Sequence, residues 1–181
     1  MMKTDLILTF TSQDRPGVVE LLTTTVVSHG GNWEESRLAK LCGDFAGIVR
    51  ISVPSENVDA FQSAVDALGD KGISATLRAS SQPTLVASDL YMLRCDGADH
   101  EGIANRITGF LAGRGINVEE MTTAVTPAPT TGTPVFNMTC TIAIAHKIDI
   151  DSLQTELAQL GNQEAVDITL SANPAESRTA H

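Results

Sequence analysis

In the first half of the chain, segments with apolar residues at the spacing typical of strands alternate with segments at the spacing typical of helices. Leu6, Leu8 and Phe10 recur at every second position, which is the period of a half-buried strand. Val18 and Val26 belong to a run with helical spacing. In order, the pattern predicts a strand at 5–11, a helix at 16–29 ended by Gly30-Gly31, strands at 33–41 and 45–53, a helix opened by Pro54-Ser55, and a strand ending at Leu77.

The second half repeats this order of elements. The pattern predicts a strand at 88–96, a helix carrying Ile103, Ile107, Phe110 and Leu111, strands at 116–125 and 136–144, a helix carrying Leu153, Leu157 and Leu160, and a strand at 166–170. The order strand–helix–strand–strand–helix–strand is that of a ferredoxin-like unit. We therefore expect an α+β protein of two βαββαβ modules, each a four-stranded antiparallel sheet with two helices on one face.

The two halves also match residue by residue at a constant offset. Asp14 faces Asp99 and Asn32 faces Asn117, both 85 positions later. Beyond residues 126–132 the offset grows to 91, which indicates an insertion of about six residues in a hairpin loop, where insertions are tolerated.

The duplication sets the expected domain boundaries. The first module spans 1–80, a linker spans 81–87, the second module spans 88–172, and 173–181 is a polar tail.

Charge and cysteine usage narrow the class of protein. Twelve basic and 22 acidic residues give a formal net charge of −10, which opposes direct binding to nucleic acid or to anionic membranes. We see neither a signal peptide nor an apolar stretch long enough to span a membrane. The three cysteines fall in strand-like runs without CxxC spacing, so we expect buried thiols and a cytoplasmic location.

The segment 11–19 joins the first strand to the first helix and is the best candidate for a binding site. Free backbone N–H groups at a helix start favour an anionic group such as a carboxylate. Gly17 allows close approach, and Asp14 would either cap the helix or hold a ligand ammonium group. The alternative is that Asp14 only caps and Pro16 only begins the helix.

The stretch Asp14-Arg15-Pro16-Gly17-Val18-Val19, followed by residues 31–38, resembles ACT domains. More narrowly, residues 4–171 resemble the tandem-ACT family of glycine cleavage system transcriptional repressors. The resemblance implies an amino-acid site formed by Asp14, Arg15, Pro16, Gly17 and Val18, with Asn32 behind them, and by the equivalents Asp99, His100, Glu101, Gly102 and Asn117. Since His100-Glu101 replaces Arg15-Pro16, we expect the first module to keep the ligand loop. The second module would complete the pocket or dock a partner.

The resemblance also implies a function. We expect a regulatory protein that binds a small amino acid, with glycine suggested by the family alone, and that acts on transcription through a partner transcription factor. No phosphate-binding loop, metal motif or catalytic constellation is recognisable, so we expect no enzyme activity and no cofactor. Free sheet edges favour a homodimer. Glu35 and Arg37 would either give one strand a charged edge that discourages pairing or pair with a partner module.

Three other functions share this topology or this charge. An RNA-binding βαββαβ module needs stacking aromatic residues and positive charge, which are scarce here. An acylphosphatase-like hydrolase would need more glycines in the loop that contains Arg15. A detached regulatory subunit of an enzyme of amino-acid metabolism remains open.

Overall fold

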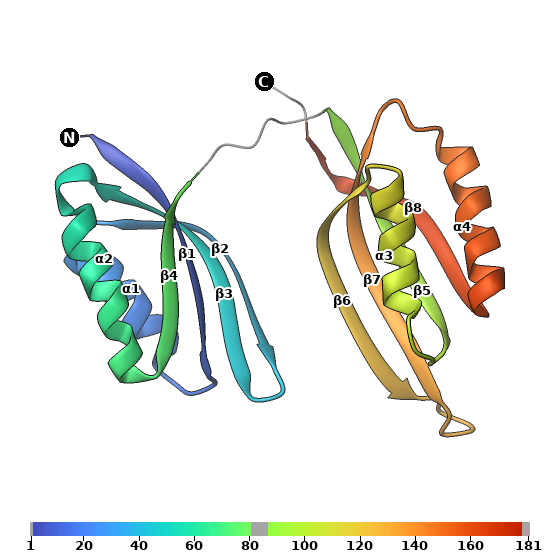
Figure 1. Ribbon diagram of the computed structural model, residues 1–181, viewed down its shortest axis with the longest axis horizontal. Coiled ribbons are helices and arrows are strands. Elements are labelled where there is room, and N and C mark those ends of the chain that lie inside the picture. Colours follow the sequence, from blue (N-terminus) through green and yellow to red (C-terminus); the bar gives the residue numbers. More distant parts are fainter. Residues whose placement is uncertain (1, 81–86, 179–181) are drawn as a thin grey trace. The chain divides into compact units, whose positions relative to one another are not determined.

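The protein folds into two compact units, Met1–Pro83 and Thr84–His181. The structure is a computed structural model that describes residues 2–80 and 87–178. Each unit contains a four-stranded antiparallel sheet with two α-helices packed on one face (Figure 1). The predicted α+β class with two ferredoxin-like modules is therefore confirmed. Of the expected linker, residues 81–86 lie outside the described residues.

The first module has the strand order β2-β3-β1-β4, so β2 and β4 are its edge strands. Its elements are β1 (Lys3–Gln13), α1 (Val18–Ser28), β2 (Asn32–Leu41), β3 (Asp44–Pro54), η1 (Ser55–Asn57), α2 (Val58–Asp66), η2 (Ala67–Lys71) and β4 (Ile73–Ala79). The single helix predicted after Pro54 is thus a short α-helix between two 3-10 turns.

The second module has the equivalent strand order β6-β7-β5-β8. Its elements are β5 (Ser88–Ala98), α3 (Ile103–Gly113), β6 (Asn117–Pro127), β7 (Pro134–Ala145), α4 (Ile150–Glu164) and β8 (Val166–Arg178). The chain was expected to leave the sheet as a tail at residue 173, but β8 continues to Arg178 with Ser177 opposite Asp89. Backbone pairing continues there because the ladder needs no apolar side chains.

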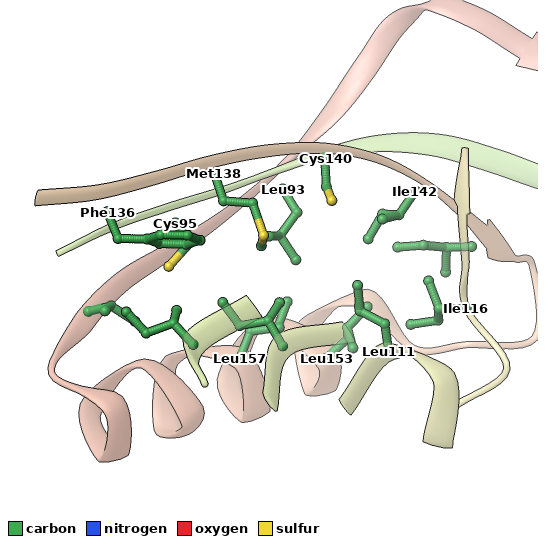
Figure 2. Packing of buried hydrophobic residues seen from close by; sticks show 14 residues of the cluster. Leu93, Cys95, Leu111, Ile116, Phe136, Met138, Cys140, Ile142, Leu153 and Leu157 are labelled. Atoms are coloured by element: carbon green, nitrogen blue, oxygen red, sulfur yellow. The ribbon is translucent and has the colours of Figure 1, made fainter. Parts of the chain in front are cut away.

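Each module has its own apolar core between the sheet and the helices. In the first module, α1 buries Val18, Leu22 and Val26 against the sheet. Figure 2 shows the second core, in which Met138 and Cys140 of β7 face Leu153 and Leu157 of α4. The helical and strand periods of the sequence therefore place the apolar side chains on facing surfaces.

Local backbone features confirm the repeat. The residue before the first helix of each module is a glycine with left-handed geometry, Gly17 (φ 92°, ψ −5°) and Gly102 (φ 91°, ψ 0°). The ladders of the equivalent edge strands β2 and β6 are interrupted at the same place, between Trp33 and Glu35 and between Val118 and Glu120. The hairpin between β6 and β7 is the longer one, as the change of offset predicts.

Two expectations about local structure are wrong. The first helix begins at Val18 instead of Pro16, because a left-handed residue at Gly17 cannot belong to a right-handed helix. Cys42 is exposed in the turn between β2 and β3, not buried in a strand. Cys42 (φ 50°) and Gly43 (φ 90°) both have positive φ, as a two-residue hairpin turn of type I′ requires.

Candidate ligand-binding loops

The loop between β1 and α1 presents an open helix start. No described side chain caps α1, so the N–H groups of its first turn have no side-chain acceptor there. A Cβ built on Gly17 would meet no described heavy atom within 4 Å, its chain neighbours aside. The loop is thus unobstructed where a Cβ of Gly17 would lie, and uncapped N–H groups at the positive end of a helix dipole suit a small anionic group.

Two contacts hold this loop to neighbouring turns. The Asp14 backbone N–H donates to the Gly43 carbonyl oxygen at 2.8 Å, and the Asp14 carboxylate forms an ion pair with Lys40. Arg15 Nη2 donates to the Lys71 carbonyl oxygen at 2.6 Å. Asp14 is therefore not the helix cap, and the alternative that it only caps is wrong. A ligand ammonium group would have to compete with Lys40 for this carboxylate.

The remaining predicted loop residues contribute in different ways. Pro16 lies in the turn before α1 and has no N–H to donate. Val18 is buried in the first core, so its backbone and not its side chain is available at the loop. The loop consequently offers backbone groups to a ligand, with the side chains of Asp14 and Arg15 on either side of them.

The second loop, between β5 and α3, is held in the same way by different side chains. The Asp99 N–H donates to the Pro134 carbonyl oxygen at 3.1 Å. His100 Nε2 contacts the Glu164 carbonyl oxygen at 2.8 Å, as Arg15 contacts that of Lys71. The replacement of arginine by histidine therefore preserves the attachment of the loop to the turn before the last strand.

The second loop differs in that a cation covers its helix start. A Cβ on Gly102 would lie 3.5 Å from Arg106 Nη2, and that guanidinium also donates to the Glu101 carbonyl oxygen. Arg106 Nε binds Glu164 Oε2 at 2.5 Å, which balances its charge. The equivalent position in the first module is Leu21, which packs against the core. The first helix start is thus open and the second is covered.

Within the first module, Asn32 and the loop lie at opposite ends of the sheet. Asn32 pairs with Ser52, which in turn faces Asp5, whereas the loop follows Gln13 at the other end of β1. At the usual rise per strand residue, these ends are roughly 25 Å apart. Asn117 opens β6 in the same way, paired with Ala143, and its Nδ2 donates to Glu119. Within a module, the structure does not bring the asparagine and the loop together.

A hollow that the sequence did not reveal lies beside the first loop. It has a volume of about 670 Å³ and is lined by Thr11, Ser12, Gln13, Asp44, Ala46, Gly69, Gly72 and Ser74. The Ser12 hydroxyl oxygen is buried and has no hydrogen-bond partner among the described residues. The hollow adds a carboxylate, an amide and hydroxyl groups to the surroundings of the loop. Gly69 and Gly72, two glycines close together before the last strand of the module, are the feature of the sequence that could have indicated this hollow.

The corresponding positions in the second module carry side chains that bind one another. Asn137, equivalent to Ala46, donates through Nδ2 to Asp96 Oδ1 at 2.7 Å. Thr126 donates to Asn137 Oδ1 at 2.8 Å. The first module has Thr11, Leu41 and Ala46 at these positions, and these three side chains cannot form the same network. The two modules therefore differ at the hollow as well as at the helix start.

The His100 contact predicts a pH-dependent stability of the second module. Hydrogen bonds to the carbonyl oxygens of Glu164 and then Glu101 raise the pKa of His100. Only a protonated imidazole carries both N–H groups needed for these two bonds. Since the folded pKa is raised, the stabilisation is complete below the unfolded pKa and is lost as the pH rises through the folded pKa.

We therefore expect the unfolding midpoint of the wild type to fall between about pH 6 and pH 8 more than that of His100→Gln. The measurement is thermal unfolding of both proteins across this range. The other three histidines are present in both the wild type and His100→Gln, so their contribution cancels in the comparison. Parallel profiles would show that His100 makes no such contribution.

Neither a metal-binding cluster nor a membrane-spanning helix is found among the described residues. Within 2–80 and 87–178, no group of three or more His, Cys, Asp or Glu side chains is placed to bind a metal ion. No helix in the same ranges is both long and apolar enough to cross a membrane.

Comparisons with known proteins agree with this architecture. Residues 4–73 match the family model of the ACT domain. Glycine cleavage system transcriptional repressors of Escherichia coli (strain K12) and Shigella flexneri are each 28% identical over 127 residues, which cover 68% of this chain. The matched segment spans 66% of the length of each of these relatives, just under two thirds.

Two solved structures extend the likeness to nearly the whole chain. An unknown protein from Galdieria sulphuraria has a TM-score of 0.81 and 28% identity, covering 95% of this chain and 99% of its own. A candidate glycine cleavage system transcriptional repressor has a TM-score of 0.69 and 20% identity, covering 96% of this chain and 100% of its own, and so shares the fold. Residues 4–73 are therefore similar to the ACT domain, the second module repeats the fold of the first, and 68% of the chain is similar to glycine cleavage system transcriptional repressors.

Proposed function

We propose that this chain is a regulatory protein that binds a small amino acid at the loop between β1 and α1. The observation that carries the proposal is the contrast at the two helix starts. Gly17 faces open space, whereas Gly102 lies under the Arg106 guanidinium. The same contrast supports a division of roles, in which the first module binds the ligand and the second is available to a partner.

The loop suits both charged groups of an amino acid. The ligand carboxylate would accept hydrogen bonds from N–H groups of the first turn of α1, next to Gly17. The ammonium group would bind the Asp14 carboxylate in place of Lys40, whose exposed ion pair with Asp14 contributes little stability. Glycine is the amino acid we propose, because the related proteins are named for the glycine cleavage system.

The proposed action on transcription is indirect. A net charge of −10 opposes contact with the DNA backbone, so the effect requires a partner transcription factor. We propose a binding role without catalysis, in the cytoplasm, where three unpaired cysteines suit a reducing environment. We also propose that the chain is a homodimer.

Substitution of Gly17 by aspartate tests the ligand loop directly. Aspartate is one of the residues found most often at positive φ, so we expect Gly17→Asp to fold, with a backbone strain that the equivalent substitution at Gly102 shares. Its carboxylate would occupy the position proposed for the ligand carboxylate. In thermal-shift measurements against the twenty amino acids, we expect the wild type to gain stability with glycine. Gly17→Asp should lose at least about 90% of that shift.

Gly102→Asp is the matched control, because Gly102 has the same backbone geometry at the covered loop. It should respond to glycine like the wild type. Asn32→Ala, at the far end of the sheet, should also respond normally. A flat profile for all amino acids in the wild type, or an equal response of Gly17→Asp, would contradict the proposal.

A further inference from the structure

The second module has a hollow at the end of its sheet opposite its loop. The hollow lies where β5 begins and where β7 connects to α4, whereas the loop follows the other end of β5 (Figure 1). Its volume is about 270 Å³. Pockets for drug-sized ligands begin at about 300 Å³, so this hollow suits a small organic molecule.

Three isoleucines and a tyrosine give the hollow an apolar wall. Ile144 is 2% exposed and belongs to the second core. Ile148, Ile150 and Tyr91 are partly buried and pack against the same core. The hollow therefore reaches the end of the core, and an aliphatic group placed in it would be removed from water.

Two ionisable side chains line the same hollow on its exposed side. His146 Nε2 lies 3.3 Å from Asp89 Oδ1, and the two side chains are 59% and 54% exposed. A pair with this exposure contributes little stability, so a ligand cation can replace the imidazole at the carboxylate. An apolar wall with a few polar groups is the usual composition of a small-molecule site.

The equivalent end of the first module is built differently. Thr4 and Ser55 occupy the positions of the carboxylate and the imidazole, and their hydroxyl groups form a hydrogen bond of 2.9 Å. The connection to the next helix, Ser55–Asn57, contains no apolar residue, whereas that of the second module contains Ile148. The exposed charged pair and the apolar wall are therefore properties of the second module and not of the fold.

We propose that this hollow is a second ligand site, which binds the ammonium and the branched aliphatic group of a small primary amine. The ammonium would bind Asp89 in place of His146, and the aliphatic group would contact the three isoleucines. The charge of the module favours a cation, because residues 84–181 include five basic and 12 acidic residues, a formal net charge of −7. The site is separate from the loop of the first module and does not depend on it.

An ammonium and a branched aliphatic group occur together both in free amines and in apolar amino acids. Three probes with the same branched group separate these sources: isoamylamine, leucine and 4-methylpentanoate. We expect isoamylamine to bind with a Kd of about 1 mM, as suits a ligand of this size. The acid, which lacks the ammonium, should bind at least about tenfold more weakly. Binding of leucine would identify amino acids as a source, and binding of isoamylamine alone would identify free amines.

Nuclear magnetic resonance of ring-labelled aromatic residues measures the binding in each module separately. Tyr91 is the single tyrosine of the chain and Trp33 the single tryptophan. Because Tyr91 lines the hollow, its ring signals should shift saturably as isoamylamine is added. The signals of Trp33, which packs against the first core, should not shift.

Two substitutions assign the roles of the ionisable pair. Asp89→Asn keeps the size of the side chain and removes its charge, so it should weaken isoamylamine binding at least about fivefold. His146→Gln should bind isoamylamine at least as tightly as the wild type, because the imidazole no longer competes for Asp89. Equal losses in the two variants would contradict this assignment of the ammonium to Asp89.

Thr4→Val is the matched control, because it removes the equivalent bond of the first module. It should leave the titration of the Tyr91 signals unchanged. Gly17→Asp should also leave it unchanged, so failure of the glycine loop and failure of this site are distinguishable. Tyr91 signals that do not respond to about 20 mM isoamylamine, or wild-type affinity of Asp89→Asn, would overturn the proposal. Equal binding of isoamylamine and 4-methylpentanoate would overturn it as well.

Discussion

Replacement of Phe61 by alanine is expected to lower the free energy of unfolding of the first module by about 3–5 kcal/mol. Phe61 lies in α2 with no exposed surface, and its ring centre is 5.6 Å from that of His29. Loss of the ring would leave a cavity that close-packed neighbours fill only in part. Urea unfolding followed by Trp33 fluorescence measures the effect, because Trp33 is the single tryptophan and packs against this core.

Val27→Ala is the control for this measurement. Val27 is on α1 of the same module, and 70% of its surface is exposed. Its loss should change the free energy of unfolding by less than about 0.5 kcal/mol. A change below about 1 kcal/mol for Phe61→Ala would show that the core of the first module is not packed as described.

Replacement of Gly161 by valine is expected to destabilise the second module by about 3 kcal/mol. Gly161 is buried in α4, and a Cβ there would lie 2.6 Å from the Val166 carbonyl oxygen. The obstacle is backbone of the adjoining strand β8, so α4 and β8 would have to separate. Circular dichroism should show an early transition of the second module while Trp33 fluorescence, which follows the first module, keeps its wild-type midpoint.

Gly69→Val is the matched control in the first module. Gly69 follows Leu68 as Gly161 follows Leu160, yet a Cβ on Gly69 would meet no described heavy atom within 4 Å. Its substitution should change stability by less than about 1 kcal/mol. Equal losses at Gly69 and Gly161 would mean that the contact with Val166 is not what excludes a side chain at Gly161.

The periodicity of apolar residues predicted the two modules because burial acts at every second strand residue and on one helix face. Leu6, Leu8 and Phe10 are all buried, and the constant offset that relates Asp14 to Asp99 is visible in the amino-acid sequence alone. The helix start was missed for a local reason. Pro16 is typical of a first helical turn, but the left-handed glycine that follows it delays the helix to Val18.

The candidate site was predicted only in part, because contacts between distant segments depend on the tertiary fold. Arg15 was named, but its acceptor, the Lys71 carbonyl oxygen, is 56 residues away. Asn32 is nearer in sequence but lies at the other end of the sheet, since α1 returns the chain to that end before β2 begins. The alignment of the two halves shows that Arg106 takes the place of Leu21. It does not show that the Arg106 guanidinium lies over Gly102 at the start of α3.

Cys42 is exposed in the turn between β2 and β3, so thiol reagents would react with this cysteine of the folded chain before the other two. Cys95 and Cys140 are buried in the second core, where burial, aided by Asp96 and Asp167, raises the pKa of Cys95 to about 11. Burial also raises the pKa of Cys140. Because the thiolate is the reactive form, a maleimide dye would attach to the folded protein at Cys42 alone. Its neighbour Gly43 accepts the Asp14 N–H, so a fluorophore there would report on the first loop without an engineered cysteine.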